Sequence, residues 1–349
     1  MITEIPTPDE LKKASRDLLR LAWDIVAESI HWYDDSDVIH ERYVPEYEII
    51  LDDGRVEKIG GPANDYTPAE REAAARQYWQ REQPKLSNAL ILVQQAIELG
   101  LKARIAEVSP FLLVVRDARE FPHEGSVEDI PFSKFRTIDA ADLLRVHNAV
   151  APHRLGTNVS DFWETLRRQR NVVMHIGWTK APPISAHELR AHILFANHFL
   201  NPDMKWTRVL LEGSDEPDLS FPYSEDVESM TYGATLQDIG GLVGELPPSM
   251  VRQYFGFDRR ARSYDCPKCA YKARQADVRF PALAQLRPPR TPGATSLYCF
   301  VCDETMPVRR ERCRNTGCRS NVLSDVDGSW GQCLVCGHGN EDTEDAAVE

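Results

Sequence analysis

The segment Lys85–Val108, KLSNALILVQQAIELGLKARIAEV, is the most strongly helical stretch of the chain and decides its fold class. Its apolar residues recur at spacings of three and four, which places them on one face of an α-helix: Leu90, Val93, Ile97, Leu101 and Ile105. Ser109-Pro110 ends the pattern, because a proline disfavours helical conformation in the residue before it. The segment therefore predicts a helix at the centre of a helical core.

Further helices are predicted on both sides of this segment. Thr7-Pro8-Asp9-Glu10 and Thr67-Pro68-Ala69-Glu70 are capping boxes, in which a threonine caps the helix and a glutamate reaches back to it. The first of these helices is expected to end near Trp32, and the second near Glu82, before Pro84. Three later helices are expected behind capping residues: Ala140–Val150, Phe162 to about His175, and Ala186–Leu200.

These segments predict a mainly α fold, with an antiparallel bundle of five or six helices over residues 1–200. A β-hairpin is expected to interrupt it near 44–60, around Asp53-Gly54. Residues 201–262 carry weaker patterns and are predicted to be a connecting region with one or two short helices. The acidic tail 341–349 has no need to fold.

Every cysteine of the chain lies in one of four close pairs: Cys266/Cys269, Cys299/Cys302, Cys313/Cys318 and Cys333/Cys336. Three pairs are C-x-x-C and one is C-x4-C, spacings that let two sulfurs share one tetrahedral ion. Four such half-sites predict two structural Zn²⁺ ions. Four-thiolate sites are closed to substrate, so chemistry has to be sought elsewhere in the chain.

Spacing alone does not decide which two cysteine pairs bind the same ion. A sequential arrangement gives two small β zinc ribbons, at 263–306 and 307–340, whereas an interleaved cross-brace joins the first pair with the third. The proline-bearing stretch Pro288–Pro292 resembles a long ribbon loop and favours the sequential form. His338 is an alternative ligand that a full set of cysteines makes unnecessary.

Composition restricts the class of protein and its partners. The start of the sequence shows no apolar signal region, and no stretch of about 18 apolar residues occurs, so we expect a cytoplasmic protein without a membrane partner. The net charge of −13 argues against a uniformly nucleic-acid-coating surface. Between Asp258 and Arg319, however, 14 basic residues face 6 acidic ones, and two zinc–thiolate centres would lower this excess to about +4. This moderate basic region is a candidate contact for a polyanion.

One short segment has residues suited to catalysis. Arg170-Asn171-Val172-Val173-Met174-His175 combines a permanent cation with an imidazole that can donate or accept a proton near neutral pH. Such a pair suits phosphodiester cleavage, since arginine can stabilise a charged phosphorane while histidine transfers a proton. No metal or cofactor is then required for the chemical step. Arg167 and Arg168 precede the motif and are candidates for contacts with an RNA backbone or for plain solvated positions.

The segment resembles the catalytic motif of the HEPN superfamily of helical ribonucleases, in which an arginine and a polar residue precede a histidine. Gln94 to Ala103, QQAIELGLKA, is similar to the long helix of such bundles. The resemblance implies a homodimer in which two copies of the motif face one cleft and cut RNA without metal. Arg170 would hold the phosphate, His175 would transfer the proton, and Asn171 would orient either of these two side chains. It also implies a defence or toxin role with a restraining protein partner.

Helix geometry supports the dependence on a second copy. Five residues of a regular helix turn through about 500°, which leaves Arg170 and His175 about 140° apart. Either the helix breaks between them, or a neighbouring chain completes the site.

Three alternatives remain. Arg170 and His175 could only satisfy carbonyl groups at the helix end near Gly177. The whole protein could be a non-catalytic dimeric adaptor whose ribbons bind a protein, or a zinc-ribbon nucleic-acid binder without chemistry.

Overall fold

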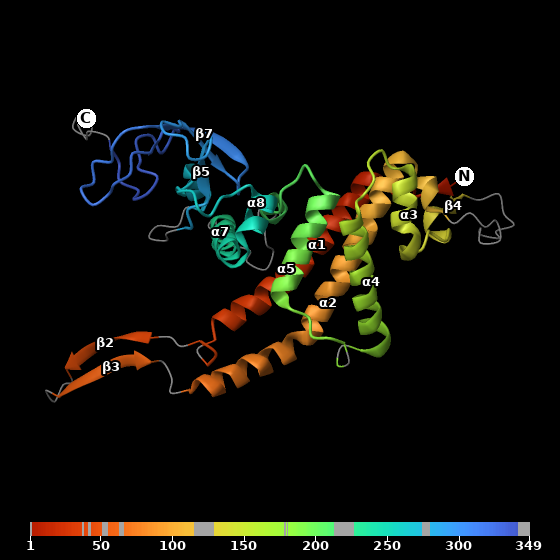
Figure 1. Ribbon diagram of the computed structural model, residues 1–349, viewed down its shortest axis with the longest axis horizontal. Helices are drawn as coiled ribbons and strands as arrows, with labels where there is room; N and C mark the ends of the chain where they lie inside the picture. Colours follow the sequence, from red (N-terminus) through yellow and green to blue (C-terminus); the bar gives the residue numbers. More distant parts are fainter. Residues whose placement is uncertain are drawn as a thin grey trace. The chain divides into compact units, whose positions relative to one another are not determined.

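The computed structural model describes residues 2–36, 38–40, 43–50, 55–62, 66–114, 129–177, 179, 181–212, 227–273 and 280–340 (Figure 1). The chain divides into two compact units, residues 1–200 and 201–349. Unit 1 is mainly helical, and unit 2 combines helices with a small antiparallel sheet, so the predicted mainly α fold is confirmed at this level. Within the described residues, no helix has both the length and the apolar character required to cross a bilayer.

The described part of unit 1 contains five α-helices, and α1, α4 and α5 lie alongside α2 (Figure 1). Their bounds are α1 (Pro8–Asp34), α2 (Pro68–Val108), α3 (Ala140–Val150), α4 (Thr157–Ile176) and α5 (Ala186–Leu200). Both predicted capping boxes are present. The amide of Glu10 donates to Oγ1 of Thr7 at 3.3 Å while Thr7 N donates to Oε2 of Glu10 at 2.8 Å, and Thr67 and Glu70 repeat these distances.

Helix α2 is a single helix of 41 residues with Pro84 inside it, so the predicted end near Glu82 is wrong. Proline has no N–H and normally breaks a helix at this point. Here the side chain of Gln83 donates to the carbonyl oxygens of Trp79, one turn earlier, and of Ile184, both at 3.1 Å. Its Oε1 also accepts from Ile184 N at 2.8 Å. The segment before α5 therefore braces the helix at the proline.

The core of unit 1 is formed around the predicted stripe of α2. All five stripe residues are buried, and Leu19, Ala22 and Val26 of α1 are fully buried as well. Gly100 is required here because a Cβ atom would lie 2.7 Å from the side chain of Leu200. Beside it, the Ser15 hydroxyl donates to Ala96 O at 2.7 Å. The absence of a side chain lets α1, α2 and α5 approach closely.

Helices α3 and α5 have the predicted bounds, but α4 begins earlier than predicted. Its N-cap is Gly156 rather than Asp161, because Val159 and Trp163 bury their side chains from the first turns onward. Asp139 precedes α3 without capping it; its carboxylate pairs with Arg136 at 3.2 Å instead.

Two small strand pairs belong to unit 1. Strands β2 (Tyr43–Ile50) and β3 (Val56–Pro62) form the predicted antiparallel hairpin, and the expected turn residues Asp53-Gly54 lie outside the described residues. Strand β1 (Ile2–Thr3) pairs in parallel with β4 (Ile130–Pro131). The described residues of unit 1 also include two short 3₁₀ helices: η1 (Pro110–Leu113) and η3 (Phe132–Lys134).

Unit 2 opens with more helix than the sequence predicts. Its described helices are α6 (Trp206–Glu212), α7 (Val227–Glu245), α8 (Pro248–Phe255) and α9 (Pro267–Ala273). Helix α7 has 19 residues and contains Gly240 and Gly241, although glycine weakens a helix. Gly240 serves a packing role, since a Cβ atom there would collide with the ring of Pro281. The described part of the expected connecting region is therefore mainly helical.

The sheet of unit 2 has the order β5-β6-β7-β8 and is antiparallel throughout. Its strands are β5 (Ala284–Arg287), β6 (Ser296–Cys299), β7 (Glu304–Arg309) and β8 (Leu323–Ser324). The predicted ribbon loop Pro288–Pro292 lies between β5 and β6. Because β7 pairs with β8, the two cysteine modules share one sheet. A further bond from Asp265 N to Leu334 O, at 2.9 Å, ties them together.

Candidate functional site

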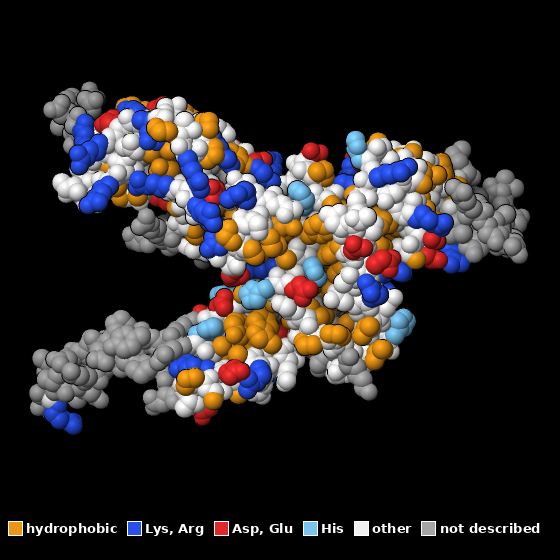
Figure 2. Space-filling view, in the orientation of Figure 1, with side chains coloured by type: hydrophobic (Ala, Val, Ile, Leu, Met, Phe, Trp, Pro, Cys, Tyr) orange, Lys and Arg blue, Asp and Glu red, His pale blue; other side chains and the backbone are white. Residues whose placement is uncertain are grey.

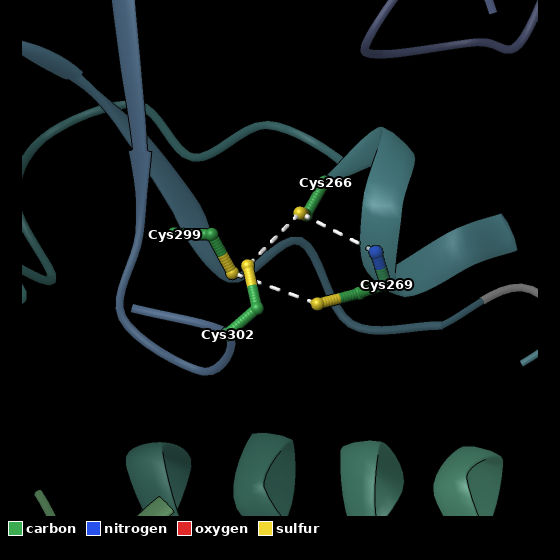
Figure 3. Close-up of side chains that lie close together, drawn as sticks. All are labelled: Cys266, Cys269, Cys299 and Cys302. Carbon is green, nitrogen blue, oxygen red and sulfur yellow. Dashed lines mark hydrogen bonds between the residues drawn. The ribbon is translucent and has the colours of Figure 1, made fainter. Parts of the chain in front are cut away.

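The first group of cysteines joins α9 to the turn after β6. Cys266 precedes α9, Cys269 lies within it, Cys299 ends β6, and Cys302 lies in the following turn (Figure 3). The four sulfurs point toward one another. Sγ of Cys266 is 3.8 Å from that of Cys302, and Sγ of Cys269 is 3.7 Å from that of Cys299.

The second group has the same form on the carboxyl side of β7. Sγ of Cys313 is 3.6 Å from that of Cys336, and Sγ of Cys318 is 3.8 Å from that of Cys333. In each group all four sulfurs lie within 4.8 Å of one another. The structure therefore groups the cysteines sequentially, not as a cross-brace.

Both groups have the geometry of a tetrahedral thiolate site. Bonds of 2.3 Å from a central ion to four sulfurs give edges of about 3.8 Å, close to the observed separations. A disulfide bond needs about 2.05 Å between its two sulfurs, so these cysteines are not joined as disulfides. The hydrogen bond with Cys269 raises the pKa of the Cys266 thiol, so four thiolates gather here only when a cation offsets their charge. Each group is thus able to hold one structural metal ion.

Neighbouring groups fix the sulfurs in place. The hydroxyl of Tyr232, on α7, donates to Sγ of Cys269 at 3.3 Å, and the amide of Ser320 donates to Sγ of Cys318 at 3.4 Å. His338 contributes its carbonyl oxygen, which accepts from Cys333 N at 2.8 Å. Among the described residues, its imidazole is not a member of the second group.

The candidate catalytic residues Arg170, Asn171 and His175 all lie on α4, which continues unbroken to Ile176. The helix therefore does not break between Arg170 and His175, and about 140° of rotation separates them. The side chain of His175 is exposed, and that of Arg170 is half-buried. Arg170 Nη1 donates to Asn171 Oδ1 at 3.2 Å. One chain alone does not bring the guanidinium and the imidazole to one point.

Arg170 lines a cavity of about 230 Å³, called the Arg170 pocket, between α2, α4 and the start of α3. It is lined by Gln94, Glu98, Asp139, Ala140, Ala141, Arg167, Arg170 and Asn171. A water molecule takes about 30 Å³ of the liquid, so the pocket has room for a phosphate group. Nε of Arg170 and Nε of Arg167 are buried and have no hydrogen-bond partner among the described residues.

The carboxylates of the Arg170 pocket are already partnered by other cations. Glu98 pairs with Lys102 at 2.8 Å, and Asp139 with Arg136 at 3.2 Å. Arg167 shares Glu164 at 3.2 Å. Since no described carboxylate pairs with Arg170, its guanidinium keeps donors available for an incoming anion.

His175 lies within an exposed apolar end of α4. Met174 and Ile176, on either side of it, are 53% and 59% exposed, unusual values for large apolar side chains. Gly177 follows at a φ of +85° and ends the helix. Among the described residues, His175 donates to no carbonyl at this helix end, so that alternative receives no support.

Other aromatic and histidine side chains have mostly structural roles. Phe300 is buried and packs on Phe255 and Phe257, with ring centroids 5.3 and 5.1 Å away. His192 is half-buried against Phe162, and burial lowers its pKa. Trp330 is exposed and has a cation over its ring, the Arg309 guanidinium, at 4.2 Å from the ring centroid.

Two site residues were not identified from the sequence. Gln94 and Glu98 bring polar groups from the core helix α2 into the Arg170 pocket, and Gln94 Nε2 donates to Glu98 Oε2 at 3.4 Å. A polar pair spaced by four beside the apolar stripe of this helix was the available signal.

Comparison with protein-family models, with curated proteins and with solved structures finds no match to this chain.

Proposed function

We propose that the protein is a HEPN-type endoribonuclease that cleaves RNA at a composite Arg/His site formed by two copies of α4, without a catalytic metal. The observation that carries the proposal is the unbroken course of α4 past His175. Because of this course, Arg170 lines a pocket whereas His175 is exposed to solvent. Both side chains are accessible, but neither forms a complete catalytic site within one chain.

The surroundings of His175 support pairing with a second chain. Met174 and Ile176 are exposed beside it, and burial of such side chains against a twofold-related α4 would be favourable. In a twofold dimer, the contact made by one chain is made again by the other. The imidazole of one chain can then approach the Arg170 pocket of its partner.

The chemistry assigned to the site balances without a cofactor. The ribose 2′-hydroxyl oxygen attacks phosphorus and transfers its proton to a base, while the bond from phosphorus to the 5′ oxygen breaks and that oxygen takes up a proton. His175 performs proton transfer, and Arg170 stabilises the phosphorane charge. Asn171 orients the Arg170 fork through its 3.2 Å hydrogen bond. The products are a 2′,3′-cyclic phosphate and a 5′-hydroxyl.

The two cysteine groups are proposed to hold Zn²⁺. Four thiolates in tetrahedral array suit this ion, and such closed sites support folding rather than chemistry. Unit 2 then serves as a metal-stapled module that aids recognition of RNA.

The test is cleavage of a labelled RNA by the purified full-length chain in EDTA-containing buffer, with the bound metal counted before and after the reaction. His175→Ala is expected to lower the rate by about 10² to 10⁴-fold, and Arg170→Ala by about 10² to 10³-fold. His153→Ala and Arg145→Ala are matched controls, since both side chains are exposed and neither residue belongs to α4.

RNA that stays intact at high protein concentration would exclude the proposal, as would cleavage that both variants retain. The former result would favour the adaptor. One feature suits that role: a groove of about 800 Å³ in unit 2, between α6, α9 and residues 326–329, beside the exposed Tyr271.

A further inference from the structure

Asp258 of unit 2 pairs with two arginines, Arg252 and Arg290, and four further arginines lie next to it in the chain or bond to the backbone near it. These arginines come from α8, from the turn that follows it, from the end of β5 and from the loop between β5 and β6. This arginine surface consists of Arg252, Arg259, Arg260, Arg262, Arg287 and Arg290. On the face drawn in Figure 2, Lys and Arg side chains gather over unit 2 with few acidic ones among them.

Asp258 holds the surface together from within. Its Oδ2 accepts from Arg290 at 2.7 Å, and its Oδ1 lies 3.6 Å from Arg252. The same Oδ1 also accepts from the amide of Arg260 at 3.0 Å, and this bond lowers the pKa of Asp258. The carboxylate is therefore used within the turn and leaves a large excess of positive charge.

Buried groups fix the backbone beneath the arginines. Gln285 is 3% exposed; its Oε1 accepts from Asp258 N at 3.0 Å, and its Nε2 donates to Asp258 O at 2.7 Å. Arg287 donates to Gly256 O at 2.8 Å, and Arg259 donates to Leu246 O at 2.9 Å. Guanidinium groups held in this way lose little conformational freedom on binding an anion.

Free donors remain at the surface. The side chains of Arg260 and Arg262 are exposed; Arg260 has no side-chain hydrogen-bond partner among the described residues, and Arg262 lies over the ring of Tyr264 at 5.6 Å. The exposed large apolar side chains described in unit 2 are Tyr271 and Trp330, and neither belongs to the arginine surface. A protein partner would therefore find no exposed large apolar side chain to bury at this surface.

We propose that the arginine surface binds the phosphodiester backbone of a polynucleotide. Planar guanidinium forks match phosphate oxygens, and contacts of this kind position a strand without reading its sequence. The inference rests on the proposed function in one respect, because it names where the RNA substrate is held. Its test measures binding alone, so a failure of cleavage and a failure of binding are separate results.

The test uses full-length protein and fluorescently labelled single-stranded RNA, followed by anisotropy across a series of salt concentrations. The patch variant Arg252→Gln/Arg260→Gln/Arg290→Gln removes three phosphate contacts. Each contact contributes about 0.7 to the slope of log K against log salt, so the slope should fall by about 2 and affinity at 0.1 M salt by roughly 100-fold. Single-stranded DNA, duplex RNA and polyglutamate serve as parallel probes.

A matched variant in the same unit removes the same charge elsewhere: Arg312→Gln/Arg314→Gln/Arg319→Gln, all exposed. Its affinity should change much less. Equal losses in both variants would show diffuse attraction and overturn the proposal, as would tight binding of polyglutamate with no binding of nucleic acid. Bound metal and circular dichroism establish that each variant is folded, and Arg260→Gln alone, which breaks no described side-chain bond, should still weaken binding by a measurable amount.

Discussion

Unit 1 and unit 2 solve the same folding problem with different forces. Unit 1 buries a continuous apolar stripe on a 41-residue helix, and its described residues include no cluster of candidate metal ligands. Unit 2 has strands of only two to six residues, and its loops converge on eight thiols. The difference teaches where each unit is vulnerable: the first to cavities in its core, the second to loss of metal.

Metal removal should separate the two units most strongly. Binding of structural Zn²⁺ contributes about 10 to 16 kcal/mol to the folding free energy of small metal-dependent modules. Chelation without added denaturant should therefore abolish the protection of backbone amides from hydrogen exchange between Cys266 and Cys336. Protection in α2 and α5 should persist, because their core contains no thiol. Hydrogen exchange with mass spectrometry measures both. Protection of unit 2 in metal-free protein would break the comparison, and elemental analysis should find two ions per chain.

A cavity in unit 1 should do the reverse. Leu101→Ala empties a fully buried position on α2 and should cost about 2 to 5 kcal/mol of unfolding free energy in that unit. Bound metal should stay at its original level. Leu21→Ala is the control, since Leu21 is 49% exposed and its loss should have little effect. The measurement is urea unfolding followed together with metal content, and loss of metal from the core variant would contradict the separation.

The hydrogen bond from Tyr232 tests how α7 supports the metal. Tyr232→Phe removes the donor to Cys269 Sγ and should lower affinity at the first site by about tenfold, as for other groups that orient metal ligands. Competition with a chromophoric chelator measures this. Tyr271→Phe is the matched control because its side chain is exposed. Equal metal affinity in the two variants would show that α7 gives the site no such support.

A smaller effect is expected from acid on unit 1. Burial lowers the pKa of His147 below its ordinary value of 6.5, so the unfolded chain binds the proton more readily than the folded chain. Stability from the neutral form is therefore present above about pH 6.5 and declines as the pH falls below it. The measurement is the difference in Tm between pH 7.5 and pH 5.5. His147→Gln should reduce this difference, whereas His153→Gln, at an exposed position, should leave it unchanged.

Local signals made much of the fold predictable. Thr7 and Thr67 each indicate the start of a helix, because a capping box is formed by residues only three positions apart. The spacing of the five stripe residues of α2 likewise predicts that they are buried. Pro84 could not be placed correctly, because the group that braces it, Ile184, is 101 residues away from Gln83 in the sequence. Gly240 has the same lesson, since its role depends on Pro281.

The sites show a similar division. Cysteine spacing predicts two four-thiol groups, and folding brings together the sulfurs that sequential sharing requires. The Arg170 pocket, by contrast, is assembled from three helices, and no spacing in the sequence indicates that Gln94 meets Arg170. The scaffold under Asp258 likewise depends on Gln285, 27 residues away.

The central claim is that one chain supplies the guanidinium and another supplies the imidazole. Arg170→Ala and His175→Ala proteins, each inactive alone, should regain RNA cleavage when mixed and allowed to exchange subunits. Random exchange makes about half of the dimers heterodimers, and each heterodimer has one of its two Arg/His sites intact. Activity should therefore reach about a quarter of the wild-type level. Activity that stays at the level of the separate variants, with heterodimers shown to be present, would contradict the account.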